Sequence, residues 1–116
     1  MPTVIQKLTA AIKGKTYMSE SDYPFEVVQW DCGDRLSLQE EVQQYGDYRT
    51  KDITVQSVAE RLEGQEGLDK LKSALALLSE ASAFVVKTKE ACVFDLIFVG
   101  YSGDQVVGVK TQVVET

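Results

Sequence analysis

Residues 92–99 constrain the fold more than any other feature of the chain, because this run is apolar at nearly every position. A strand with one solvated face alternates apolar and polar residues, whereas a strand covered on both faces does not. Runs 84–88 and 106–114 also have strand character, and residues 100–104 between the last two runs predict a hairpin loop. We therefore expect antiparallel strands with helices on both faces of their sheet.

The first half of the chain predicts two helices. In residues 3–13, apolar side chains recur at spacings of three and four, Pro2 suits a helix start, and Gly14 suits a stop. A second helix over 37–46 begins with a capping-box pattern and ends at a glycine. The capping pair is Ser37 and Glu40, and the apolar stripe behind it is Leu38, Val42 and Tyr45.

Two further helices are predicted in the middle of the chain. Thr54 can cap the first of them, and Gly64 ends it. The second follows almost at once, and its buried face is expected to consist mainly of leucine. The residues of that face are Leu68, Leu71, Leu75 and Leu78, supported by Ala74 and Ala81.

The extended segments complete an α+β architecture. Residues 25–30 are β-branched and aromatic and predict a strand, and residues 48–53 predict a short edge strand. The expected order is helix, strand, helix, strand, two helices, three strands, arranged as a three-layer α/β/α sandwich around a mainly antiparallel mixed sheet. A chain of 116 residues is too short for two cores, so residues 1–116 form one domain.

Charge and composition exclude several classes of function. Asp and Glu number 18 against 12 Lys and Arg, which gives a net charge of −6. This sign repels phosphate backbones, so we expect a basic partner and no direct nucleic-acid binding. The chain contains no His, which excludes Ser-His-Asp and Cys-His nucleophiles and zinc sites that need imidazole. We expect no cofactor and no enzymatic activity.

The remaining composition indicates a soluble protein. No run approaches the ~18 apolar residues of a membrane span, and the first residues show no signal-peptide pattern. Cys32 and Cys92 make no metal-ligand spacing, and buried thiols in a reducing cytosol are favoured over a disulfide. Whether the two cysteines lie close together stays open. We expect a cytoplasmic protein that is monomeric when free and does not bind membranes.

Asp95 is the one acid within the apolar run 92–99. A carboxylate in such surroundings is a candidate general base or metal ligand. The alternative is a carboxylate at a sheet edge or paired with a lysine, and it is favoured because no second catalytic group is visible.

Other polar and aromatic residues favour structural interpretations. The acidic pairs Asp31/Asp34 and Glu40/Glu41 lack the loop pattern of a calcium site, so solvated surface is expected. Trp30 is a possible interaction anchor, but an aromatic residue that closes a strand is more often part of the core.

Two further segments are unusual. Residues 18–27 read Met-Ser-Glu-Ser-Asp-Tyr-Pro-Phe-Glu-Val, an acidic turn that enters a strand. Residues 108–116 leave only two positions after the last valine, so we expect the terminal carboxylate and the Thr116 hydroxyl to stay near the sheet. A capped turn and a frayed end are the structural explanations of these segments.

At these segments the chain resembles the nuclease A inhibitor family, small bacterial proteins that inhibit sugar-nonspecific ββα-metal nucleases. The family pattern is Met-Ser-Glu-Ser, an acid, Tyr-Pro-Phe-Glu-Val and then a Trp-acid pair. It corresponds to residues 18–27 with Trp30 and Asp31. The family ending, a Gly followed by Thr-x-Val-Val-Glu-Thr, corresponds to Gly108 and residues 111–116.

The resemblance implies both a fold and a mechanism. The fold is similar to the pathogenesis-related-1 type, with the element order given above. The inhibitor fills the DNA cleft of a basic, magnesium-dependent nuclease, and its C-terminal threonine directs a carboxylate and a hydroxyl at the catalytic metal. By position that residue is Thr116, and the important glutamate of the family turn is Glu20. The expected surrounding contacts are Ser19, Ser21, Asp22 and Glu115.

The chain departs from the family pattern at residues 62–67. The family's best-known form carries a longer acidic and aromatic loop there, whereas this segment is short and has no Trp. The departure implies weaker inhibition, a different nuclease, or loss of inhibition. The alternative function is a non-enzymatic binding module of the same fold whose partner is not a nuclease.

Overall fold

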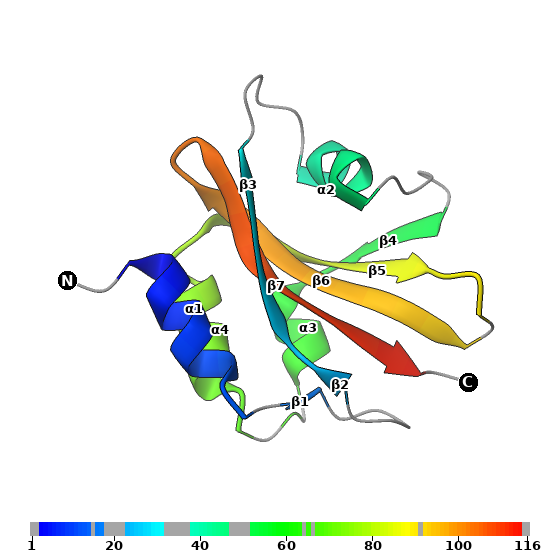
Figure 1. The fold of residues 1–116 in the computed structure, drawn as a ribbon, viewed down its shortest axis with the longest axis horizontal. Helices are drawn as coiled ribbons and strands as arrows, with labels where there is room; N and C mark the ends of the chain where they lie inside the picture. Colours follow the sequence, from blue (N-terminus) through cyan, green and yellow to red (C-terminus); the bar gives the residue numbers. More distant parts are fainter. Residues whose placement is uncertain are drawn as a thin grey trace.

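A computed structural model describes residues 3–14, 16–17, 23–31, 38–46, 52–63, 65, 67–90 and 92–114 (Figure 1). The helices and the shorter strands lie in the first two thirds of the chain, and three long strands form the last third. In chain order the elements are α1 (Val4–Ile12), β1 (Thr16–Tyr17), β2 (Tyr23–Pro24), β3 (Glu26–Asp31), α2 (Leu38–Gly46), β4 (Ile53–Gln56), α3 (Val58–Leu62), α4 (Asp69–Leu75), β5 (Ser79–Lys87), β6 (Val93–Ser102) and β7 (Gln105–Val114).

Five strands form one antiparallel sheet in the order β3-β7-β6-β5-β4. The apolar run belongs to β6, which lies in the middle of the sheet and is buried without interruption over residues 95–101. This confirms the predicted α+β class and the central position of that strand. β1 and β2 form a separate two-stranded pair that the expected element order lacks.

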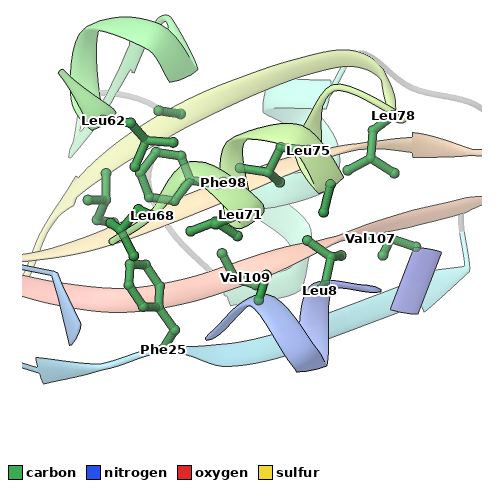
Figure 2. Packing of buried hydrophobic residues seen from close by; sticks show 14 of the residues in the cluster. Leu8, Phe25, Leu62, Leu68, Leu71, Leu75, Leu78, Phe98, Val107 and Val109 are labelled. Carbon is green, nitrogen blue, oxygen red and sulfur yellow. The ribbon is translucent and has the colours of Figure 1, made fainter. Parts of the chain in front are cut away.

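Helices lie against both faces of the sheet (Figure 1). On one face, α1, α3 and α4 cover a cluster that includes Phe98 and Val109. Figure 2 shows Leu8 of α1 and Leu71 of α4 among the side chains packed there. On the other face, α2 covers a second cluster that includes Ile97. Since neighbouring positions of β6 enter opposite clusters, the absence of alternation in this strand follows from its burial on both sides.

The first helix begins close to the predicted position. The Thr3 hydroxyl accepts a hydrogen bond from the Gln6 backbone N–H at 3.2 Å, and the Gln6 side chain accepts one from the Thr3 N–H at 2.9 Å. These reciprocal bonds satisfy two backbone donors that a helix start leaves open. None of the helices within the described ranges has the length and apolar character that crossing a membrane requires.

The prediction that Thr54 caps a helix is wrong. Thr54 lies in the edge strand β4, and the helix begins later, with the Ser57 hydroxyl accepting from the Glu60 N–H at 3.0 Å. Val55 lies on this strand as well and is 48% exposed. The β-branched run 53–55 favours a strand, and a serine directly after it supplies a better-placed cap.

The fourth helix is shorter than its leucine pattern suggests. All four predicted leucines are buried, but the helix spans only Asp69–Leu75, so Leu78 follows it and Ala81 belongs to β5. The pairing of β5 with β6 shifts between Ser79 and Ser82, where the backbone φ of Glu80 is +57°. This irregularity lets the strand begin close to the helix end.

The last hairpin is tighter than expected. Ser102 and Gln105 are paired, so only Gly103 and Asp104 form the turn, whereas a loop over 100–104 was predicted. The positive φ of Gly103, +61°, suits glycine in this turn. Gly100 lies within β6 instead, where a Cβ atom would approach the Leu78 Cβ to 2.7 Å. The close approach of Leu78 therefore explains why residue 100 of β6 is a glycine.

Candidate partner interface

The structure joins the two unusual segments at one edge of the sheet. The Thr111 hydroxyl of β7 donates a hydrogen bond to the backbone carbonyl of Pro24 in β2 at 3.0 Å, although the residues are 87 positions apart. Thr111 is 4% exposed, so the hydroxyl that donates this bond is buried, whereas Pro24 is exposed. The bond fixes the strand that follows residues 18–22 to the strand that precedes the C-terminus.

The strand register shows how this edge is built. Tyr17 is paired with Tyr23 in the β1–β2 pair, so the described residues on either side of 18–22 are neighbours. β3 pairs with β7 only as far as Glu26 opposite Lys110, and β7 continues beside β6 to Val114. β2 lies beside this last part of β7. The described strands that flank the two predicted contact segments therefore lie at the same edge.

The predicted contact residues themselves lie outside the described ranges. This applies to Ser19, Glu20, Ser21, Asp22, Glu115 and Thr116. Their roles stay predictions, and the structure contributes the positions of the strands that flank them.

A hollow of about 270 Å³ lies between the flanking strands. Pro24, Phe25 and Glu26 line one side, and residues 110–112 line the other. Phe25 is buried and anchors this side, with its ring centroid 6.4 Å from that of Phe98. Glu26 and Lys110 are directly paired across the strands, so side chains of opposite charge lie at the hollow. Such an arrangement suits recognition of polar groups on a partner.

Asp95 is a structural residue of the sheet. Its Oδ1 accepts a hydrogen bond from the Gln112 Nε2 at 3.1 Å, and Asp95 is 8% exposed. The expected sheet-edge position is wrong, because Asp95 lies on the central strand β6. Asp95 lines none of the three hollows described for this structure. Within the described part of the chain, no group of three or more His, Cys, Asp or Glu residues is arranged to hold a metal ion.

Trp30 combines a core position with an aromatic stack that the sequence did not predict. It packs against the cluster under α2, as expected, and also stacks on Tyr45 with ring centroids 4.2 Å apart and an interplanar angle of 9°. Its indole Nε1 donates to the Glu41 Oε2 at 3.3 Å. Glu41 is 5% exposed, so the prediction that it is solvated is wrong. Tyr45 lies on the predicted apolar stripe of α2, since it stacks on Trp30, but it is 43% exposed.

The four-residue spacing of Glu41 and Tyr45 is the sequence feature from which this stack could have been predicted. Residues four apart share one face of a helix, so α2 presents a carboxylate and an aromatic ring together. A partly buried indole N–H needs an acceptor, and Trp30 lies on the neighbouring strand. Of the other acidic pair, Asp31 is exposed, as expected for solvated surface. Asp34 lies outside the described residues.

Cys92 does not have the predicted burial. It is exposed and free, with a backbone φ of +68° just before β6, so it belongs to the turn and not to the apolar strand. Cys32 lies outside the described residues.

A short link follows α3, at the position where the resemblance implied a longer loop. Within its described residues, the Gln65 N–H donates to the Leu62 carbonyl at 3.1 Å, and Gly67 has a φ of +78°. α4 then begins at Asp69. The sequence between these helices contains no aromatic residue.

Comparison with known proteins identifies one family. The family model described as "Nuclease A inhibitor-like protein" matches residues 2–63, which is more than half of the chain and includes β1, β2 and β3. No curated protein matches the chain.

Proposed function

This chain belongs to the nuclease A inhibitor-like family, and from this premise we propose that it inhibits a sugar-nonspecific, metal-dependent endonuclease. In this proposal the protein occupies the DNA cleft of the enzyme and performs no chemistry of its own. A cleft that binds DNA is basic, and the net charge of −6 favours association with such a surface. The attraction weakens as salt screens it.

The observation that carries the proposal is the bond between Thr111 and Pro24. It brings the strand after the acidic turn and the last strand of the chain to one edge of the sheet. The strands that flank the two proposed contact segments therefore meet at one edge, which supports an inhibitor that uses both segments. The hollow between Glu26 and Lys110 lies in the same place.

The proposed roles follow from the chemistry of a catalytic magnesium ion. Magnesium prefers oxygen ligands and keeps several waters, so a carboxylate and a hydroxyl can take positions that DNA would use. We assign these groups to Thr116 and a second anionic contact to Glu20. The supporting contacts are Ser19, Ser21, Asp22 and Glu115.

The proposal includes a similarity to the pathogenesis-related-1 type of three-layer α/β/α sandwich. It also takes the free protein to be a cytoplasmic monomer. The helices on both faces of the sheet support the first part of this description.

A DNA-digestion assay tests the function. A magnesium-dependent, sugar-nonspecific nuclease is titrated with the intact chain, with a form lacking Thr116, and with Leu77→Ala as a control, because Leu77 is 58% exposed and lies away from this edge. We expect stoichiometric inhibition by the intact chain and the control. Loss of a dominant contact costs ~2 kcal/mol or more, so truncation weakens inhibition by at least ~30-fold. Equal inhibition by the truncated form contradicts the assigned role of Thr116.

The short link between α3 and α4 favours a second candidate, a binding module of the same fold with a different partner. The link offers no aromatic anchor of the kind that often dominates an interface. Absence of inhibition by the intact chain supports this candidate, whereas tight and metal-dependent inhibition rejects it.

A further inference from the structure

The stack of Trp30 and Tyr45 is a rigid aromatic feature that the proposed contact segments do not use. The two rings are nearly parallel and close, at 4.2 Å and 9°. Trp30 packs against the hydrophobic cluster under α2, and its indole Nε1 donates a hydrogen bond to the Glu41 Oε2. These two contacts restrict the position of the indole ring. Glu41 is buried, so this bond operates where water screens it little. The orientation of the stack is therefore fixed before any partner binds.

The outer member of the stack is available to a partner. Tyr45 is 43% exposed although one of its ring faces rests on Trp30. The face of an aromatic ring is electron-rich and attracts cations. Hydrogen bonding to a carboxylate adds electron density to the indole, which strengthens this property of the stacked pair. An exposed ring of this kind is suited to a guanidinium group, which is planar and stacks on aromatic faces.

The segments next to the stack carry acidic side chains and no basic ones. Residues 26–31, 38–46 and 101–106 contain acids but no Lys or Arg. These segments adjoin one another, because Trp30 is paired with Val106 in the sheet and α2 lies over the same face. The acids near the stack are Glu40, Glu41 and Asp104. Glu26 is not counted because it lies opposite Lys110, and Asp31 is not counted because it lies on the other face of β3, where its Oδ1 accepts a hydrogen bond from the Gln105 Nε2 at 3.1 Å. Their field favours a cationic group at the stack over a neutral one.

The stack lies on the same edge strand as the hollow between the strands that flank the candidate contact segments. Glu26, Val28 and Trp30 alternate onto one face of β3, and Glu26 lines the hollow beside β7. With a rise of ~3.4 Å per residue, Trp30 lies about 14 Å along the strand from Glu26. A standard interface covers about 800 Å² of each partner, roughly 30 Å across, so one partner can contact both places.

We infer that the Trp30–Tyr45 stack is a second contact point for the nuclease, where an arginine side chain from the basic cleft lies on the exposed ring of Tyr45. This inference rests on the proposed function for the identity of the partner. It differs from the metal-directed contact, because it concerns the opposite end of β3 and a cation in place of a metal ion.

The only Trp of the chain provides a local probe. Incorporation of 5-fluorotryptophan gives a single ¹⁹F resonance at Trp30, which is not obscured by tryptophans of the nuclease. Addition of the nuclease is expected to shift this resonance in the intact chain. We expect Tyr45→Ala to weaken nuclease binding by about tenfold, since a cation over an aromatic face contributes in this range once water is excluded. Tyr45→Phe keeps the ring and is expected to bind within about threefold of the intact chain.

The control variant is Val55→Ala, which removes an apolar side chain of similar exposure from the opposite edge strand. It is expected to bind the nuclease like the intact chain. Circular dichroism of each variant verifies folding. If the nuclease binds and inhibition is normal, but Tyr45→Ala binds like the intact chain and the ¹⁹F signal does not move, the inference is overturned while the proposed function stands.

A peptide of eight arginines separates the two proposals if the nuclease does not bind. A ¹⁹F shift on titration of the intact chain, absent in Tyr45→Ala, supports an arginine site at the stack even though the proposed function then fails. An equal response of the two forms, or no response, rejects the arginine site.

Discussion

Replacing Thr111 by Val tests whether the bond between β7 and β2 supports the contact surface. Valine has nearly the same shape, so the change removes the hydroxyl that donates to the Pro24 carbonyl at 3.0 Å and leaves the packing of the buried side chain in place. Thr111→Ser is the matched control, because serine keeps the hydroxyl and loses the methyl group. The two variants therefore separate the hydrogen bond from the packing at one position.

The structure sets the size of both effects. A hydrogen bond of this type contributes ~1 kcal/mol, and Pro24 is exposed, so its freed carbonyl can bind water and the loss stays near that value. Removal of a buried methyl group also costs ~1 kcal/mol. Both variants should therefore lower the unfolding midpoint by ~4 °C. If the lost bond also releases β2 from its bound position, 1 kcal/mol corresponds to about fivefold weaker inhibition for Thr111→Val alone.

Thermal unfolding by circular dichroism measures the first quantity, and titration of nuclease activity measures the second. We expect similar stability losses in the two variants and weaker inhibition only in Thr111→Val. Inhibition by Thr111→Val that equals that of the intact chain would refute the argument that this bond positions the contact surface. Weaker inhibition by both variants would point to general loosening of the fold.

Three other predictions concern stability and use urea unfolding. Gly108→Ala should destabilise the protein by about 3 kcal/mol, because an added Cβ would lie 2.7 Å from the Val99 Cα in the paired strand; unchanged stability contradicts the observed strand separation. Ser57→Ala should cost ~1 kcal/mol by removing the cap from the Glu60 N–H, and no loss would argue against a helix start there. Leu71→Ala should cost ~3 kcal/mol, because this side chain is fully buried, and a loss below ~1 kcal/mol would contradict the packing of α4.

The sheet and its core could be predicted at positions where burial leaves a recognisable pattern of apolar residues in the sequence. A strand without alternation must be covered twice, which placed 92–99 at the centre of the sheet. The leucines 68, 71, 75 and 78 were correctly predicted to be buried, although the helix that carries most of them is shorter than expected. Gly46 was correctly predicted to end α2. These features depend on local periodicity, which a single sequence contains.

Features that depend on distant contacts were not predictable. A short edge strand was predicted over 48–53, whereas the observed edge strand β4 is Ile53–Gln56; residues 53–56 pair with β5, although their local sequence also suits a capped helix. Glu41 is buried because Trp30, on another element, donates a hydrogen bond to it. At the candidate interface, sequence patterns singled out the two segments, but only the fold shows that Pro24 and Thr111 are in contact.

The central claim is that the C-terminal residue acts on the metal of a nuclease, and a binding cycle tests it most directly. Calorimetric titration compares the intact chain and the form lacking Thr116 against the nuclease with and without magnesium. We predict that truncation weakens binding by at least ~30-fold when the metal is present and has little effect when it is absent. An equal effect of truncation in both conditions would contradict metal-directed binding by Thr116.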